Sequence, residues 1–240
     1  MLQMRSLLLF SSLLLTGCGS IQHLSSYTKQ KDPLEPFNRG MYAFNDAVDR
    51  AVVKPVAQGY AASVPEPAKN MISNFFSNLD DVVVTANDLL QFKFKQALSD
   101  GSRVIFNSTF GLFGLFNVTE RLPKHNEDFG QTLGYWGVPS GPYLVLPVLG
   151  PSSFRDGVGR YGDGYASVIN NTEHVPTRNT AWALEGLDTR AGLLEQEKVL
   201  EEALIDRYSF IRDAYLMRRQ SLVYDGSPPK INYDDEDWEE

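Results

Sequence analysis

The sequence has a single cysteine and three histidines among 240 residues, and these shortages exclude several classes of protein. One thiol cannot form an intrachain disulfide or a Cys-based zinc cluster. Acidic residues outnumber lysine and arginine by 30 to 22, which argues against nucleic acid as a partner because phosphate binding relies on basic side chains. With 42% hydrophobic residues, the composition is that of a globular protein rather than of a chain that crosses a membrane many times.

The first 17 residues have the pattern of a bacterial lipoprotein signal peptide. The apolar run Leu7–Leu15 is interrupted only by two serines and is shorter than the ~20 residues that span a membrane. It leads to Cys18 in the order Leu-Thr-Gly-Cys, which resembles the lipobox, where the cysteine is acylated and the signal is cut before it. The alternative is an ordinary secretory signal with an incidental cysteine. The sequence thus predicts a lipid anchor on Cys18, and Gly19 in place of Asp favours the outer membrane by resemblance to lipoprotein sorting rules.

The chain divides into four predicted segments. Residues 1–17 form the signal peptide, 18–31 a polar lipidated tether, 32–224 a helical domain and 225–240 a disordered acidic tail. The tail holds seven acidic residues and one lysine, so it carries most of the net charge of −8. The body that remains is nearly balanced in charge and can lie against a membrane.

Helical periodicity dominates the folded part, so the predicted fold class is mainly α. Apolar residues recur at steps of four, three and four from Phe37 to Val48, which indicates one face of an amphipathic helix that ends near Pro55. Further helices are expected from about Pro65, with a bend near residues 78–81, over residues 182–194 and over residues 199–215.

Residues 101–164 depart from this pattern because they hold 12 of the 19 glycines and five of the 13 prolines. Yet this segment contains two apolar stretches, Val104–Phe116 and Pro142–Leu149, both too short to cross a bilayer. One interpretation is ordinary core, with a buried helix followed by a buried irregular hairpin. The other is that part of this surface faces lipid, because short apolar helices at the interface suit a protein anchored beside a membrane.

Sequence motifs typical of enzyme active sites are scarce in this chain. No G-x-S-x-G elbow occurs, and the three histidines, at 23, 125 and 174, lack the spacing of a metal site, so we expect no catalytic residue, metal or cofactor. One G-x-G-x-x-G match runs from Gly157 to Gly162. We interpret it as a flexible or close-packed turn, because prolines interrupt the preceding apolar run and no clear helix follows. The adjacent Arg155 and Asp156 are interpreted as a local ion pair.

Several long motifs resemble the MlaA (VacJ) family of outer-membrane lipoproteins. In order they are DPLEPFNRGMYAFND from Asp32, VPEPAKNMISNFFSNL from Val64, RVIFNSTFGLFGLFNV from Arg103, EDFGQTLGYWGVPSGPYLVLPVLGPSSFRD from Glu127, EGLDTRAGLL from Glu185 and DRYSFIRDAYLMRR from Asp206. They extend from about Asp32 to Arg219, which is nearly all of the chain between the predicted tether and the acidic tail.

This resemblance implies a ring-like helical bundle, with the Gly/Pro-rich hairpin in its middle, set in the inner leaflet of the outer membrane. Family members help to move misplaced phospholipid from the outer leaflet inward without hydrolysing it. They work with a trimeric porin and pass the lipid toward a soluble periplasmic carrier. A membrane-anchored phospholipid hydrolase and a purely structural envelope lipoprotein are the two alternatives.

Candidate site residues follow from combining this resemblance with the apolar and glycine-rich segments. A ring in one leaflet needs an apolar belt, for which the candidates are Ile105, Phe106, Phe110, Phe113 and Phe116. Irregular backbone at membrane depth is tolerated only inside protein or beside water. The candidate channel and hinge residues are therefore Gly134, Gly137, Gly141, Pro142, Tyr143, Pro147 and Gly150. Phe44 and Asn45 are the candidate gating residues, expected to pack near the hairpin, with core packing as the alternative for Phe44.

Overall fold

The computed structural model describes residues 32–201 and 206–229 of the chain. Cys18, the predicted signal peptide and tether, and residues 230–240 of the predicted tail lie outside the described residues. The folded unit spans residues 31–228.

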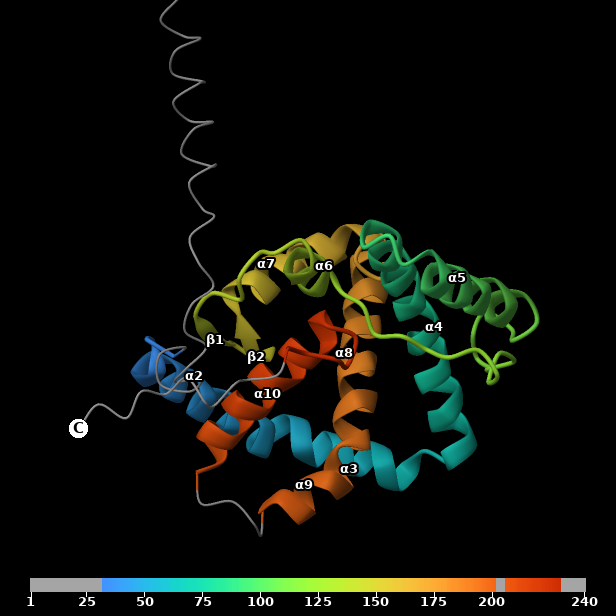
Figure 1. Ribbon diagram of the computed structural model, residues 1–240. Helices are drawn as coiled ribbons and strands as arrows, with labels where there is room; N and C mark the ends of the chain where they lie inside the picture. Colours follow the sequence, from blue (N-terminus) through green and yellow to red (C-terminus); the bar gives the residue numbers. More distant parts are fainter. Residues whose placement is uncertain (1–31, 202–205, 230–240) are drawn as a thin grey trace, which may run out of the picture. The chain divides into compact units, whose positions relative to one another are not determined.

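Helices make up most of the described residues, which confirms the prediction of a mainly α fold (Figure 1). In chain order the elements are α2 (Glu35–Val48), a π-helical turn (Asp49–Val53), α3 (Lys54–Ser63), α4 (Glu66–Leu90), α5 (Phe94–Thr109), α6 (Phe129–Tyr135), β1 (Tyr143–Leu146), β2 (Gly150–Ser153), α7 (Phe154–Ala166), α8 (Val175–Gly192), α9 (Leu194–Glu201) and α10 (Arg207–Val223).

The contacts between these elements close a ring. From α2, contacts run through the π-helical turn to α3, then to α8, α4, α6, α10, β2 and β1, which returns to α2. Helix α5 packs alongside α4, and α7 packs on α6. Ring-like connectivity within the folded unit thus agrees with the predicted bundle.

The first amphipathic helix ends before Pro55, as expected, because α2 ends at Val48. Pro55 lies in the first turn of α3, where its missing N–H would have no helical partner, and a π-helical turn joins the two helices. Helix α4 runs unbroken for 25 residues, so the helix is continuous through residues 78–81, where the bend is predicted. Its Asn78 and Asp81 are buried on the packed face.

The boundary between the last two helices differs from the prediction. The expected helix over residues 199–215 is not a single described segment, since α9 ends at Glu201 and α10 begins at Arg207. The Asp206 side chain accepts a hydrogen bond from the Ser209 N–H at 3.2 Å, which caps the start of α10.

The G-x-G-x-x-G segment lies inside α7 and is helical, so its interpretation as a turn is wrong. The expectation of close packing is confirmed. A Cβ on Gly159 would lie 2.4 Å from the Gly130 backbone nitrogen, and one on Gly162 would lie 2.4 Å from a ring carbon of Phe129. Helices α6 and α7 approach so closely because these positions carry no side chain.

Strands β1 and β2 form an antiparallel hairpin with Tyr143 opposite Ser153 and Leu146 opposite Gly150. The turn between them contains Pro147, whose ring fixes one backbone angle and whose position outside the strands leaves the ladder intact. Tyr143 and Val145 point into a small apolar cluster with Tyr208 and Leu216 of α10.

The interior of the folded unit is unusually polar. Among the described residues, ten hydrophobic residues are buried, against twenty polar or charged ones. Of the phenylalanines described, only Phe76 is buried, and ten others have exposed side chains. This distribution reverses the usual one, in which apolar side chains fill the core and charged ones stay outside.

Candidate functional site

The five candidate belt residues are all exposed. Their exposed fractions are 63% for Ile105, 46% for Phe106, 71% for Phe110, 78% for Phe113 and 47% for Phe116. Ordinary core, the alternative for this stretch, is therefore wrong for these side chains. Contiguous apolar surface of this kind marks contact with lipid or with another protein.

The loop that follows α5 keeps its polar groups inward and its apolar side chains outward. Leu112, Phe113 and Gly114 all have positive φ, at 51°, 59° and 92°. The first two are strained in this region, which favours glycine. Asn107 holds the loop from within: its backbone oxygen accepts from the Gly114 N–H at 2.9 Å and its side-chain oxygen from the Val118 N–H at 2.9 Å.

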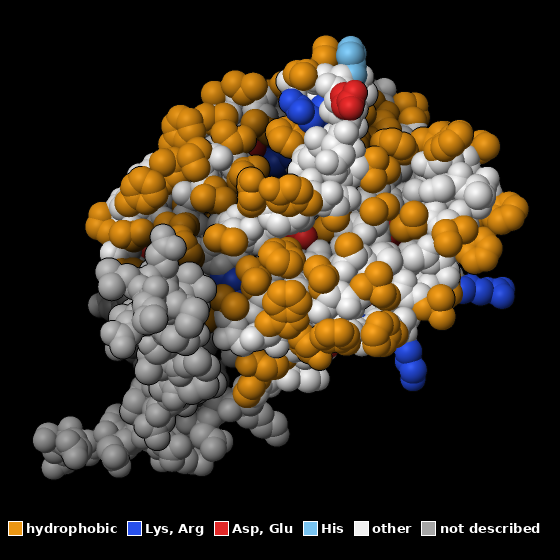
Figure 2. All heavy atoms as spheres, turned by 90° about the horizontal axis from the view of Figure 1, so that it is seen from above, with side chains coloured by type: hydrophobic (Ala, Val, Ile, Leu, Met, Phe, Trp, Pro, Cys, Tyr) orange, Lys and Arg blue, Asp and Glu red, His pale blue; other side chains and the backbone are white. Residues whose placement is uncertain are grey.

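The apolar surface extends from α5 to α7. Exposed large side chains on α7 recur at helical spacing, at Phe154, Val158, Tyr161 and Tyr165. Figure 2, which views the face that carries α5, α6 and α7, shows hydrophobic side chains over most of that face and few charged ones. Because these side chains come from elements distant in the sequence, the apolar surface belongs to the fold rather than to one segment.

Helix α2 holds the hairpin through two asparagines on one helix face. Asn38 donates to the Tyr143 carbonyl and accepts from the Val145 N–H, both at 2.9 Å. Asn45 repeats this pattern one step along the hairpin, donating to the Leu146 carbonyl at 2.9 Å and accepting from the Val148 N–H at 2.8 Å. Asn38 thus completes the free edge of β1, as a neighbouring strand would, whereas Asn45 joins the last residue of β1 to the turn that follows it. We call Asn38 and Asn45 the asparagine clamp.

Phe44, the other candidate gating residue, is half exposed at 50%. Its alternative role as a core residue does not fit this exposure. Asn45 contacts the hairpin directly. A role of Asn45 and Phe44 in gating stays a prediction. Asn38 was missed, although its spacing of seven residues from Asn45 places both on one helix face and could have indicated it.

The candidate hinge residues fall into four groups. Gly137, Gly141 and Gly150 have positive φ, at 90°, 68° and 78°, and so adopt conformations that most other residues avoid. Gly134 lies in α6, where a Cβ would be 2.7 Å from Arg155, so it permits close packing rather than bending. Tyr143 is only 1% exposed and belongs to the core cluster. Pro142 and Pro147 flank β1, and the Pro142 carbonyl accepts from the Phe154 N–H at 3.0 Å.

Removing the Asn45 amide should loosen the hairpin turn. In Asn45→Ala, the Val148 N–H loses its acceptor, and we expect its amide hydrogen exchange to accelerate about fivefold because a net hydrogen bond contributes about 1 kcal/mol. Exchange read by NMR or by peptide mass would measure this. Phe44→Ala is the matched control, since it lies next in the chain and makes no such bond. Equal exchange at Val148 in wild type and Asn45→Ala would show that the clamp does not restrain the turn.

Buried polar side chains connect α4 to α6 and α7. Asn87 donates to Asp163 at 2.8 Å and accepts from Thr132 at 2.8 Å. Gln91 donates to Glu127 at 2.8 Å, and Lys93 pairs with the same carboxylate at 2.8 Å. These bonds compensate the cost of removing polar groups from water, so a polar interior is compatible with a stable fold.

Two carboxyl groups in this interior have raised pKa values. Burial, together with the charges of Asp100 and Glu127, raises the pKa of Asp88 to about 7. Burial likewise raises the pKa of Asp163 to about 6. Asp88 is therefore largely protonated below neutral pH, which limits the repulsion among the buried acids.

The two histidines that the structure describes, His125 and His174, each contact a polar side chain. The His125 ring lies 2.6 Å from Asp100, and the His174 ring lies 2.7 Å from the Thr177 hydroxyl at the start of α8. In residues 32–201 and 206–229, no hydrogen bond joins Ser140 to His125, and no cluster of three metal-ligating side chains occurs. The predicted ion pair of Arg155 with Asp156 is present at 3.1 Å.

An apolar cavity of about 440 Å³ lies between α4 and the first half of α8. Its walls include Ile72, Phe75 and Phe76 of α4 and Ala181 and Leu184 of α8. This volume is in the range of small-molecule sites, and its lining suits hydrocarbon.

The fold and its surfaces together define a helical protein with an apolar exterior, a hydrogen-bonded polar interior and a clamped hairpin. Across the ranges that the structure describes, no helix is both long and apolar enough to cross a membrane.

The chain belongs to the MlaA lipoprotein family, whose family model matches residues 30–222. It is 37% identical over 232 residues to the intermembrane phospholipid transport system lipoprotein MlaA of Escherichia coli K12, covering 92% of this chain and 89% of that protein. It is 32% identical over 224 residues to the protein of the same name from Haemophilus influenzae Rd, covering 91% and 89%.

A solved structure, described as the structural basis for maintenance of bacterial outer membrane lipid asymmetry, has the same fold. Its TM-score is 0.72 at 33% sequence identity, and the match covers 80% of this chain and 98% of that one. The predicted resemblance to the family is thereby confirmed.

Proposed function

We propose that this chain is a lipid-anchored protein of the outer membrane that removes mislocalised phospholipid from the outer leaflet and passes it toward the periplasm. The observation that carries the proposal is the reversed distribution of side chains, with phenylalanines outside and carboxylates and amides inside. A protein set in one leaflet needs an apolar exterior toward the acyl chains. It also needs a polar or mixed interior along which a head group moves. The names of the relatives, phospholipid transport lipoproteins, support the same role.

In this proposal each candidate residue has a role. Ile105, Phe106, Phe110, Phe113 and Phe116 contact acyl chains of the surrounding leaflet. The hairpin with Gly137, Gly141 and Gly150 borders the lipid path and changes position there, while the asparagine clamp sets how far it moves. Residues 32–224 form the working domain, and residues 1–17, 18–31 and 225–240 are signal peptide, tether and acidic tail.

The proposed partners are phospholipids, a trimeric porin of the outer membrane and a soluble periplasmic lipid-binding carrier. The porin and the carrier rest on the family resemblance. Transport without bond cleavage fits the relatives' names and the bonding of His125 to Asp100 rather than to a nucleophile. We therefore propose a role without catalysis, metal or cofactor.

Deleting the gene and restoring it tests the transport role. We expect outer-leaflet phospholipid to rise in the deletion strain and to return to its starting level on complementation. An unchanged level after deletion would favour a purely structural lipoprotein. Purified protein with labelled phospholipid should release no fatty acid. Release that depends on Ser140 or His125 would favour a hydrolase.

Replacing Cys18 tests the anchor. Cys18→Ala removes the only thiol of the chain, so acylation at that position becomes impossible. We expect the Cys18→Ala protein to be absent from the outer-membrane fraction. Its measured mass should lack the acyl chains. Ser20→Ala is the matched control, since it lies beside the anchor without altering it. A Cys18→Ala protein with unchanged mass and fractionation would contradict the lipobox assignment.

A further inference from the structure

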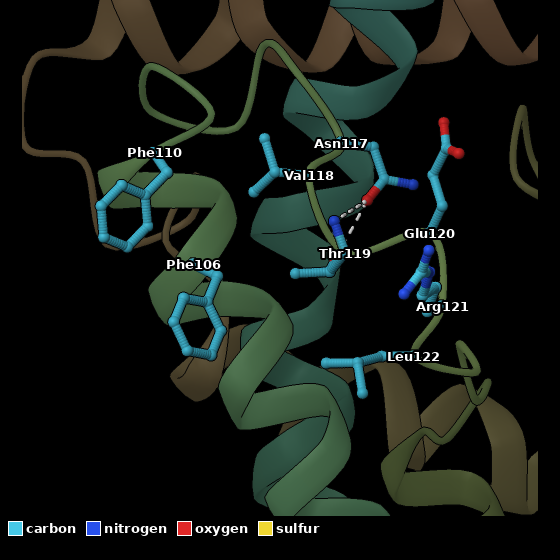
Figure 3. A pocket seen from close by; sticks show the side chains of 8 residues that line it. All are labelled: Phe106, Phe110, Asn117, Val118, Thr119, Glu120, Arg121 and Leu122. Carbon is cyan, nitrogen blue, oxygen red and sulfur yellow. Dashed lines mark hydrogen bonds between the residues drawn. The ribbon is translucent and has the colours of Figure 1, made fainter.

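A second cavity, of about 850 Å³, lies on the outer side of α5 and within the apolar surface. It is formed between α5 and the segment that returns along it, residues 117–122 (Figure 3). Its lining residues are Phe106, Phe110, Asn117, Val118, Thr119, Glu120, Arg121 and Leu122. We call it the α5 groove. Its volume is in the range of sites that hold one ligand of moderate size.

One wall of the α5 groove is aromatic. The rings of Phe106 and Phe110 are stacked, with centroids 6.0 Å apart and planes inclined by 23°. Phe106 lies on α5 and Phe110 caps its end, while Val118 and Leu122 come from the returning segment (Figure 3). This arrangement leaves a strip of hydrocarbon between the two elements, suited to an extended acyl chain.

The polar groups at the base of the groove are already paired. Thr119 is 6% exposed, and its hydroxyl lies 3.2 Å from the Asn107 side-chain oxygen and 3.0 Å from that of Asn117. The Thr119 N–H also donates to Asn117 at 3.1 Å. An apolar chain that covers Thr119 therefore leaves its hydroxyl and N–H paired, which avoids the usual cost of covering polar groups.

One end of the groove carries two opposite charges. Glu120 and Arg121 are exposed neighbours, and neither has an ion-pair partner within residues 32–201 and 206–229. The buried arginines differ: Arg103 pairs with Asp81 at 3.0 Å, and Arg219 pairs with Asp156 at 2.8 Å. A guanidinium without a carboxylate partner is suited to bind a phosphate through two parallel hydrogen bonds.

We propose that the α5 groove binds one zwitterionic aminophospholipid of the surrounding leaflet. The phosphodiester lies on Arg121, the ammonium group on Glu120, and an acyl chain along Phe106 and Phe110. The pair of opposite charges beside an apolar wall, and the membership of Phe106 and Phe110 in the belt, select a lipid over a protein segment. The inference rests on the proposed function in one respect, because it requires α5 to face acyl chains. It goes beyond that function by naming the class of head group and by placing the lipid at a site outside the transport path.

Native mass spectrometry of the full-length acylated protein in detergent tests this site. The probes are dioleoyl phosphatidylethanolamine, which has an ammonium group, and dioleoyl phosphatidylglycerol, which lacks one. We expect Arg121→Gln to weaken retention of both lipids about tenfold or more, because both carry the phosphate. We expect Glu120→Gln to weaken retention of phosphatidylethanolamine alone.

Two controls separate the groove from the belt. Arg160→Gln removes an exposed arginine on α7, and Phe113→Ala removes a belt ring that does not line the groove. Both should retain phosphatidylethanolamine as wild type does, whereas Phe110→Ala should not. Circular dichroism checks that every variant folds.

Equal lipid retention by wild type and Arg121→Gln would overturn the site. So would an equal effect of Glu120→Gln on the two lipids, or loss of a co-purifying protein in place of lipid. The amount of phospholipid in the outer leaflet of cells distinguishes failure of the groove assignment from failure of the proposed function. If the wild-type gene restores lipid asymmetry while Arg121→Gln leaves lipid retention unchanged, transport stands and the groove assignment fails.

Discussion

Gly159→Val is expected to leave little folded protein. The added Cβ would lie 2.4 Å from the Gly130 nitrogen and 2.6 Å from its Cα, both backbone atoms that cannot rotate away. Helices α6 and α7 must therefore separate, which breaks their packing and costs about 3 kcal/mol or more. Thermal unfolding followed by circular dichroism would measure the loss.

Gly157→Ala is the matched control on the same helix. A Cβ there meets only the Ser152 hydroxyl, at 3.9 Å, which is an ordinary contact. Replacing glycine by alanine inside a helix stabilises it by up to about 1 kcal/mol, so we expect this variant to unfold at the same or a higher temperature. A Gly159→Val protein that melts like wild type would show that α6 and α7 do not pack as described.

Arg219→Met should destabilise the fold by about 3–5 kcal/mol at neutral pH, the usual cost of breaking a buried ion pair. Arg219 on α10 donates to both carboxylate oxygens of Asp128 and, at 2.8 Å, to Asp156. Asp156 in turn accepts from the Tyr215 hydroxyl at 2.6 Å. Methionine keeps much of the side-chain volume but leaves both carboxylates without this cation. Urea unfolding would measure the loss.

The pH dependence of the Arg219→Met effect has a definite sign. Burial alone would raise the pKa of Asp128 and of Asp156, but the hydrogen bonds and charge of Arg219 hold both below their usual value. The stability that these pairs contribute is present above pH about 4, the unfolded pKa of Asp, and is lost as pH falls through the folded value. The difference in free energy of unfolding between wild type and Arg219→Met should therefore be smaller at pH 3 than at neutral pH.

Arg50→Ala is the control for a surface ion pair. Arg50 pairs with Asp46 one helical turn earlier at 2.8 Å, and its side chain is 65% exposed. Such pairs contribute about 0.3–0.5 kcal/mol, so this variant should unfold close to wild type at every pH. A loss for Arg219→Met no larger than that for Arg50→Ala would contradict a buried, stabilising role for the network.

The sequence by itself determined the helical class and the family. Helical spacing of apolar residues is a local property, and so is the concentration of Gly and Pro that predicted a hairpin around residues 134–150. The hairpin strands lie at Tyr143–Leu146 and Gly150–Ser153, so its first part as predicted is instead the end of α6. The family followed from long ordered motifs, and the possible lipid contact of Ile105 to Phe116 followed from their run of apolar residues. The asparagine clamp was half visible, because Asn45 was selected while Asn38 was not.

Only the tertiary structure decided which apolar residues lie outside and which polar residues lie inside. Periodicity shows that a helix has two faces, but it does not show which face packs when the exterior is also apolar. The prediction of a turn at Gly157 to Gly162 failed for a similar reason, because glycines that serve helix packing resemble glycines that serve a turn. The α5 groove likewise depends on residues 106–110 and 117–122 meeting in space. Local sequence patterns specified the helices and the apolar stretches, and contacts between distant segments decided which of their side chains face outward.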